Sequence, residues 1–201
     1  MELMGVKLET DGDVYEPSDD SVLLAQGVQT YAQGKFLEIG CASGFVSILA
    51  AKKNEVTQVT GVDVNPKAID SSWRNAELNC VEKKCVFMES NLFSAINGKQ
   101  FDTIAFNPPY LPTGEEEKVR GELNKAFDGG EDGRSTIGEF LEQFQEYLKP
   151  NGVLLTIESS LCNYELTIQK LTEFGFNVEI IGRQKFFFEE IVCIKATKFH
   201  Q

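Results

Sequence analysis

Short apolar runs alternate along this chain with longer segments of helical periodicity, and this alternation constrains the fold more than any other feature. It is typical of βα units, in which helices connect buried, mostly parallel strands. We therefore predict one α/β domain with a mostly parallel sheet and helices on both faces. The seven expected strands are Phe36–Ile39, Gln58–Val62, Cys85–Met88, Thr103–Phe106, Val153–Ile157, Val178–Ile181 and Ile191–Lys195.

Local start signals place helices between these strands, because capping residues and a first-turn proline precede segments of helical periodicity. The expected starts are Ser18, Asn65 followed by Pro66, Ser135 with a helix that ends before Pro150, and Asn163 with a helix that ends near Gly175. The pattern runs without a composition break, so we expect a single domain over residues 1–201, with residues 1–17 as an N-terminal extension.

Charge and residue usage exclude several classes of function. A net charge of −12 argues against binding nucleic acid through its phosphates, which needs clustered Lys and Arg. The acidic clusters Asp19–Asp20 and Glu115–Glu117 are expected to be solvated surface. The single histidine, His200, nearly excludes histidine triads and zinc sites, so no metal is expected.

The cysteines and the hydropathy indicate a cellular compartment. Five scattered cysteines with no C-x-x-C pair indicate reduced thiols, which we expect to be small buried side chains. No apolar run approaches the roughly 20 residues that cross a bilayer. We therefore expect a cytoplasmic protein with no membrane contact.

A turn of small residues between two acids indicates a nucleoside site. The turn Gly40–Gly44 follows the first strand, and small residues there let a ligand approach the backbone. Ala42 stands where the dinucleotide fingerprint requires glycine. Glu38 would repel a pyrophosphate but can meet a cationic or hydroxyl-bearing group, and Asp63 can accept hydrogen bonds from ribose hydroxyls. The pattern indicates a nucleoside without phosphates.

The sequence Asn107-Pro108-Pro109-Tyr110 directly follows a predicted strand, where α/β sheets place their ligands. The two prolines lack an N–H, which leaves the carbonyl groups of this segment available as acceptors. The side-chain oxygen of Asn107 and the carbonyl of Pro108 can accept both hydrogens of a planar –NH₂ group, while Tyr110 stacks on it. We expect this motif to hold an amide or amino nitrogen.

Five segments together resemble a known family. Leu37–Gly44, Gly61–Asn65 and Phe106–Tyr110 resemble the Rossmann-like class I methyltransferases of the protein-(glutamine-N5) family related to HemK, especially its archaeal and eukaryotic short forms. Val14–Ser21 and Gly129–Arg134 resemble the same branch. The resemblance implies S-adenosyl-L-methionine as cofactor and in-line displacement at its methyl carbon. It also implies that no separate helical substrate domain is present.

The resemblance carries roles over to particular residues. It implies cofactor contacts at Ser21, Glu38, Gly40, Gly44, Asp63, Val64, Asn91, Leu92 and Asn107, and a catalytic motif of Asn107, Pro108, Pro109 and Tyr110. The family usually has glycine at position 42 and aspartate at position 91, where Ala42 and Asn91 stand; the Asn91 amide oxygen can still accept a hydrogen bond from the adenine amine. From the long loop of residues 108–134, Arg134 and Arg120 are candidates for gripping a substrate.

The substrate remains open between several acceptors. A glutamine side-chain amide and the exocyclic amine of adenine share one geometry, so the motif does not choose between them. Charge and resemblance favour a glutamine in the conserved loop of a peptide chain release factor over adenine in DNA or RNA, and over protein lysine. A cofactor-binding scaffold without activity is the non-enzymatic alternative. A nicotinamide-dependent oxidoreductase lacks support, because the dinucleotide glycine pattern is incomplete.

A partner protein is also implied. The related short forms pair with a small zinc-binding activator that covers an exposed sheet edge. The run Phe186–Phe188 would suit a contact with such a partner, although we expect it to pack in the core.

Overall fold

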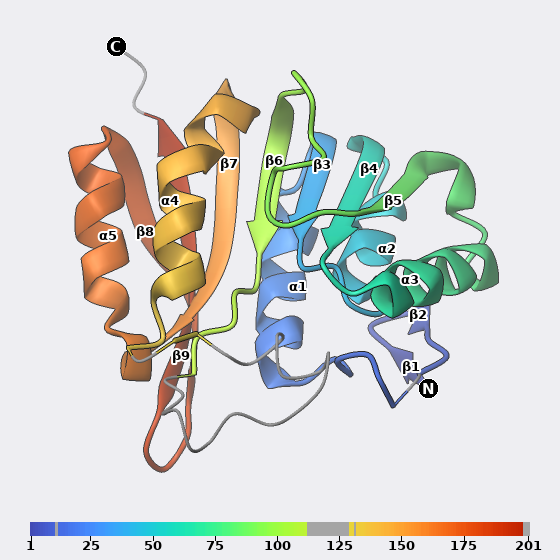
Figure 1. Cartoon of the computed structure of the whole chain (residues 1–201), viewed down its shortest axis with the longest axis horizontal. Helices are drawn as coiled ribbons and strands as arrows, with labels where there is room; N and C mark the ends of the chain where they lie inside the picture. Colours follow the sequence, from blue (N-terminus) through green and yellow to red (C-terminus); the bar gives the residue numbers. More distant parts are fainter. Residues whose placement is uncertain (11, 112–128, 131, 199–201) are drawn as a thin grey trace.

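A seven-stranded sheet forms the centre of the computed structural model, which describes residues 1–10, 12–111, 129–130 and 132–198 (Figure 1). The strand order is β5-β4-β3-β6-β7-β9-β8, parallel from β5 to β7 and antiparallel at β9. Every predicted strand lies within an observed one, which confirms the fold class. The strands are β3 (Gly34–Ile39), β4 (Val56–Asp63), β5 (Cys85–Glu89), β6 (Phe101–Phe106), β7 (Leu148–Ser159), β8 (Phe176–Lys185) and β9 (Glu190–Lys198).

Helices cover both faces of this sheet, as the sequence predicts (Figure 1). One face packs against α1 (Asp19–Tyr31), α2 (Phe45–Ala51) and α3 (Pro66–Leu78); the other packs against α4 (Ser135–Tyr147) and α5 (Tyr164–Glu173). Neighbouring residues of a strand point to opposite faces, so Phe36 joins the first core and Leu37 the second. Among the described residues, no helix is both long and apolar enough to span a bilayer.

The helices begin where their capping residues predict. Ser18 is the N-cap of α1, and its backbone N–H donates to the Ser21 hydroxyl at 3.4 Å. Asn65 caps α3 by accepting a hydrogen bond from the Lys67 amide at 3.0 Å, and Pro66 occupies the first turn. Helix α4 begins at Ser135, with Arg134 as its N-cap.

The N-terminal extension contains a hairpin that the sequence reasoning did not predict. Its strands, β1 (Glu2–Leu3) and β2 (Val6–Lys7), are too short to show a period-two pattern. The side chain of Asn75 on α3 exchanges hydrogen bonds with the backbone of residue 9, and that of Asn79, the C-cap of α3, with the backbone of residue 7. Tertiary contacts therefore hold the extension against the domain.

Four of the five cysteines are buried, as expected for small apolar side chains. Cys80 departs from this expectation and is exposed. It follows the end of α3 in a left-handed conformation with φ of 57°, in a turn at the surface.

The connections of the sheet create a crevice at its carboxyl edge. Strand β3 lies in the middle with β4 on one side and β6 on the other, so the chain leaves these strands in opposite directions. Ligands bind outside the carboxyl ends of strands at such a switch point. Because β8 runs in the same direction as β7, the turn between β8 and β9 lies at this edge too.

Candidate active site

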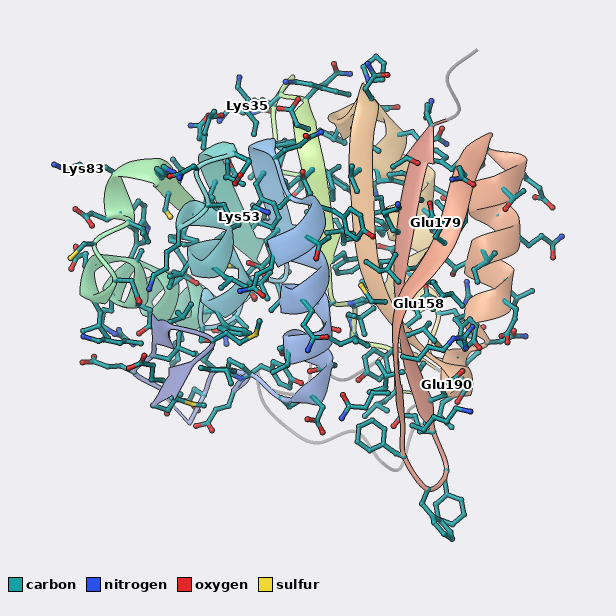
Figure 2. The ribbon with its side chains drawn as sticks, turned by 180° about the vertical axis from the view of Figure 1, so that it is seen from behind. Lys35, Lys53, Lys83, Glu158, Glu179 and Glu190 are labelled. Atoms are coloured by element: carbon teal, nitrogen blue, oxygen red, sulfur yellow. The ribbon has the colours of Figure 1, made fainter. Side chains whose placement is uncertain are left out.

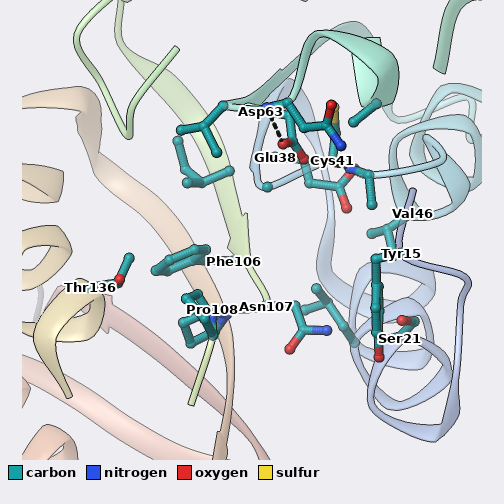
Figure 3. Close-up of a pocket in the computed structure, with 18 of the residues that line it drawn as sticks. Tyr15, Ser21, Glu38, Cys41, Val46, Asp63, Phe106, Asn107, Pro108 and Thr136 are labelled. Carbon is teal, nitrogen blue, oxygen red and sulfur yellow. Dashed lines mark hydrogen bonds between the residues drawn. The ribbon is translucent and has the colours of Figure 1, made fainter. Parts of the chain in front are cut away.

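A cavity of about 1130 Å³ opens at the carboxyl ends of β3, β4 and β6 (Figure 3). It is large enough for a nucleoside with an attached side chain. Of the predicted site residues that the structure describes, all but two line it: Ser21, Glu38, Gly40, Asp63, Val64, Asn91, Leu92, Asn107, Pro108, Pro109 and Tyr110. Gly44 and Arg134 are absent from the lining. The fold therefore brings together segments that are up to about 90 residues apart.

The charged side chains that line the cavity are all acidic among the described residues. Its described residues include no lysine, arginine or histidine. Its acidic members are Asp20, Glu38, Asp63, Glu89 and Glu189. Such a surface attracts cationic or hydroxyl-bearing ligands and repels phosphates.

The turn after β3 exposes its backbone to the cavity. Gly40 has φ of 69° and open space around it: the nearest atom to an added β-carbon is the backbone oxygen of Asn107, at 3.9 Å. Gly44 has φ of 80° and caps α2, where a β-carbon would lie 3.0 Å from the Ser72 hydroxyl. Gly44 therefore allows α2 to approach α3, and its position does not support a direct ligand contact.

Ala42 also has a left-handed backbone, with φ of 47°, where side chains other than glycine are strained. Its amide donates to Asp63 Oδ2 at 2.9 Å, and its carbonyl accepts from the Ser72 hydroxyl at 3.0 Å. These bonds hold the turn between the ends of β3 and β4.

Glu38 and Asp63 lie close together at one end of the cavity (Figure 3). Burial raises the pKa of Glu38 to about 8; a hydrogen bond from the Ser47 hydroxyl opposes this rise, and the charge of Asp63 adds to it. Burial also raises the pKa of Asp63, although the amides of Asn65 and Ala42 donate to it. A cationic group or hydroxyl donors bound here would stabilise both ionised carboxylates.

The segment after β5 supplies another wall of the cavity. Asn91 is exposed at the rim, and Leu92 is buried with φ of 47°. The Asn91 backbone N–H donates to the Ser94 hydroxyl at 3.2 Å. The contact of the Asn91 side chain with a ligand base stays a prediction.

Asn107 and Tyr110 meet a buried carboxylate at the opposite end of the cavity. Asn107 Nδ2 donates to Asp20 Oδ2 at 3.0 Å, and the Tyr110 hydroxyl donates to the same oxygen at 3.2 Å. The Tyr15 hydroxyl donates to Asp20 as well, at 2.8 Å. Burial would raise the pKa of Asp20, but hydrogen bonds from Asn107, Ser18 and Tyr15 lower it below its usual range. Asp20 is therefore ionised at neutral pH.

The side-chain oxygen of Asn107 is buried and has no hydrogen-bond partner among the described residues. A carboxylate only accepts hydrogen bonds, so the –NH₂ end of Asn107 must face Asp20 and the oxygen must face away from it. Buried polar atoms are usually paired, so an unpaired acceptor inside a cavity indicates a ligand donor. Figure 3 shows Asn107 close to Tyr15 and Ser21.

The expectation that Asp19 and Asp20 are both solvated surface is wrong for Asp20, which is only 5% exposed. Asp19 is exposed, as expected. The two neighbours differ in burial because consecutive residues of a helix point about 100° apart around its axis. The nearby Tyr15 and Ser18 carried the only local signal for a polar cluster.

Arg134 does not reach the cavity. Its guanidinium donates to the carbonyls of Cys162 and Asn163 and to the Thr167 hydroxyl, at 2.7 to 3.1 Å, and it forms an ion pair with the buried Glu158 at 3.4 Å. These contacts hold the start of α4 against α5, so its position does not support substrate binding. Arg120 lies outside the described residues.

The sequence and the fold match known proteins. Residues 15–188 match the family model named methyltransferase small domain. A protein of Methanocaldococcus jannaschii named as a protein N5-glutamine methyltransferase is 45% identical, over 98% of each chain. A release factor glutamine methyltransferase of Geobacter sulfurreducens is 33% identical over 70% of this chain and half of its own length. The structure of Mtq2 with Trm112 from E. cuniculi has a TM-score of 0.72 at 22% identity, covering 93% of this chain and 99% of that one.

The fold and the site define a Rossmann-like class I methyltransferase. The match to the family model and the identity with the M. jannaschii protein both span nearly the whole chain. The chain belongs to the methyltransferase small domain family and, within it, to the HemK-related protein-(glutamine-N5) methyltransferases.

Proposed function

We propose that this enzyme transfers a methyl group from S-adenosyl-L-methionine to the side-chain amide of a glutamine in a peptide chain release factor. The observation that carries the proposal is the buried, unpaired oxygen of Asn107, which Asp20 orients away from itself. The names of the relatives from M. jannaschii and G. sulfurreducens support glutamine as the acceptor.

The cavity fits this cofactor. Acids without a basic neighbour in the described lining suit a cationic nucleoside, and the open space at Gly40 admits a ligand to the backbone. When bound, S-adenosyl-L-methionine supplies an activated methyl group and its leaving group. The residues that would hold it are Ser21, Glu38, Gly40, Asp63, Val64, Asn91, Leu92 and Asn107.

The residues of the motif bind and orient the acceptor nitrogen. The Asn107 oxygen and the Pro108 carbonyl accept its two hydrogens, which reduces delocalisation of the nitrogen lone pair. Positioning also accelerates the reaction, because both reactants are held in one cavity. No group of the motif is a strong base, so the proton leaves to water after the nitrogen has gained the methyl group.

Asp20 and Tyr110 prepare this site before the substrate arrives. Asp20 keeps the Asn107 carboxamide from rotating, and its bond with the Tyr110 hydroxyl restrains the tyrosine ring. Burial and the charge of Asp20 raise the pKa of Tyr110 well above its ordinary value, so the hydroxyl stays a donor. A restrained aromatic ring suits a flat amide.

The acidic lining favours a polypeptide over a nucleic acid as substrate. A phosphate backbone would meet Asp20, Glu89 and Glu189 with no described lysine or arginine in the lining to neutralise it. Adenine in DNA or RNA therefore stays the second candidate, and protein lysine the third.

We also propose a small zinc-binding activator as partner. Strand β5 is at one edge of the sheet and pairs only with β4 among the described residues. Such an edge offers unpaired backbone groups to another chain. The similar Mtq2 chain was solved in complex with Trm112.

A methyl-transfer assay tests the proposal. The purified protein, alone and with an activator, is incubated with labelled S-adenosyl-L-methionine and a recombinant release factor from M. jannaschii. Mass spectrometry should locate one added methyl group on a glutamine, and a release factor with that glutamine changed to asparagine should stay unlabelled. Methyl transfer only to adenine-containing DNA or RNA would contradict the glutamine assignment. Calorimetry with NAD in place of S-adenosyl-L-methionine should show no binding.

A further inference from the structure

Three consecutive phenylalanines are exposed at the turn between β8 and β9. Phe187 and Phe188 are 91% and 85% exposed, and Phe186 is 42% exposed. The expectation that this run packs in the core is therefore wrong. The rings of Phe187 and Phe188 contact each other edge to face, with centroids 4.5 Å apart. Figure 2 shows this turn projecting from the body of the molecule beyond Glu190.

The base of this hairpin is held by specific contacts. The Phe186 amide donates to the Glu189 carbonyl at 2.7 Å, which closes the turn. Glu189 accepts a hydrogen bond from the Ser159 hydroxyl at 2.6 Å, and Arg183 pairs with Glu190 at 2.7 Å. The rings are thus presented on an ordered support, which lowers the entropy lost when they bind a partner.

The base of the hairpin that carries the rings reaches the active-site cavity. Glu189, which directly follows Phe188, lines that cavity. The turn is at the carboxyl edge of the sheet, where Asn107 also lies. A chain advances by about 3.3 Å per residue, so a polypeptide with one residue in the cavity has neighbours within reach of the rings.

We propose that Phe186–Phe188, the aromatic tip, binds apolar side chains flanking the methylated residue of a protein substrate. This rests on the proposed function, which requires a polypeptide loop to enter the cavity. Exposed aromatic side chains cost solubility and usually mark a contact surface. A free small molecule would fill the cavity without touching the tip. The acidic lining of the cavity disfavours a nucleic acid as the substrate that enters it.

Binding and kinetics of a tip variant test this inference. The variant Phe187→Ser/Phe188→Ser removes both exposed rings, and Phe187→Leu/Phe188→Leu keeps apolar side chains as a conservative match. Leu78→Ser is the control, because Leu78 is 42% exposed on α3, which packs near the opposite edge of the sheet. Equilibrium binding of fluorescently labelled M. jannaschii release factor is measured with S-adenosyl-L-methionine present. Circular dichroism verifies that each variant is folded.

The serine variant should bind the release factor about 10-fold or more weakly, because two aromatic contacts at the centre of an interface are worth at least that much. The leucine variant should keep most of the affinity, and Leu78→Ser all of it. In turnover, the KM for the release factor should rise. The affinity for S-adenosyl-L-methionine, and the rate on a short glutamine peptide without apolar flanking residues, should stay within about twofold.

Unchanged affinity of the serine variant would overturn the inference, as would a release factor that fails to bind the wild type. The inference would also be overturned if the aromatic tip binds a second copy of this chain or RNA. In that case the serine variant would lose self-association or RNA binding and keep its affinity for the release factor. Binding of the release factor is measured without turnover. The binding result therefore tests the role of the aromatic tip, and the methyl-transfer assay tests the proposed function. A wild type that binds the release factor but never methylates glutamine contradicts the proposed function and leaves the docking result standing.

Discussion

The carboxamide of Asn107 donates a hydrogen bond to the carboxylate of Asp20 at one end of the cavity, with Nδ2 of Asn107 3.0 Å from Oδ2 of Asp20. Eighty-seven positions of sequence separate them. Because the carboxylate can only accept, it determines which end of the carboxamide faces away from it. The fold therefore sets the orientation of the Asn107 oxygen, the proposed acceptor for the substrate.

Replacing Asp20 with asparagine should lower kcat by about 10- to 100-fold, the usual effect of losing a residue that orients a catalytic group. An amide at position 20 can donate to Asn107, so the Asn107 carboxamide can turn and present its –NH₂ end to the substrate. The affinity for S-adenosyl-L-methionine, measured by calorimetry, should stay within about twofold. Asp19→Asn, an exposed neighbour, is the matched control. A kcat equal to that of the wild type would remove Asp20 from the mechanism.

Asn107→Ala should reduce turnover by at least about 100-fold, because it removes an acceptor that is needed most in the transition state. Cofactor binding should survive in large part, since many residues other than Asn107 line the cavity, among them Glu38 and Asp63 at its opposite end. Single-turnover methyl transfer and calorimetry separate the two effects. Asn177→Ala, on the exposed side of β8, should change neither. Retained turnover in Asn107→Ala would count directly against its role.

Glu38 should make cofactor affinity depend on pH. Its pKa is about 8 in the free protein, and a bound cation favours the carboxylate, so the complex holds fewer protons. Affinity should therefore rise between about pH 6 and pH 8 and then level off. Glu38→Gln should flatten this rise. Calorimetry between about pH 6 and pH 8, in buffers with different ionisation enthalpies, measures the proton released on cofactor binding. If the affinity of Glu38→Gln depends on pH as that of the wild type does, the proton comes from another group.

The same residue should affect stability in the opposite sense. A carboxyl group whose pKa is about 8 when folded and about 4.3 when unfolded stabilises the fold fully only below the unfolded value. That contribution is lost as pH rises through 8. The free energy of unfolding of Glu38→Gln, from urea titrations, should fall less steeply with pH than that of the wild type.

Ala42→Gly should stabilise the protein by about 1 kcal/mol, since glycine adopts φ of 47° without the strain that a β-carbon causes. For a domain of this size the melting temperature should rise by about 2–4 °C. Ala42→Val should lower it, because a branched side chain is worse in this conformation. A melting temperature that falls on glycine substitution would show that the methyl group contributes more through packing than it costs in strain.

Arg134→Met should destabilise the fold by about 3 kcal/mol, because it leaves the buried Glu158 without its cation. Burial already raises the pKa of Glu158 to about 7, and loss of Arg134 should raise it further. The double variant Arg134→Met/Glu158→Gln should recover part of the loss in a double-mutant cycle. Equilibrium unfolding measures each step. Unchanged stability with a higher substrate KM would instead restore Arg134 as a substrate contact.

The sequence by itself determined the strands, most helix starts and the glycine-containing turn after β3, because these depend on residues that are close in the chain. Period-two and helical patterns, capping side chains and glycines with positive φ act over a few residues. The motif Asn107–Tyr110 was predictable for the same reason. Its location after a strand of a parallel sheet implied the cavity.

Only the tertiary structure decided which side chains meet. Asp20 reads as a surface acid until the fold brings Asn107 and Tyr110 to it. Arg134 reads as a substrate-binding loop residue until the fold brings Thr167 of α5 and Glu158 of β7 to it. The run Phe186–Phe188 reads as core until the hairpin carries it past the sheet. Burial and pairing depend on contacts between distant segments, so no local pattern contains them.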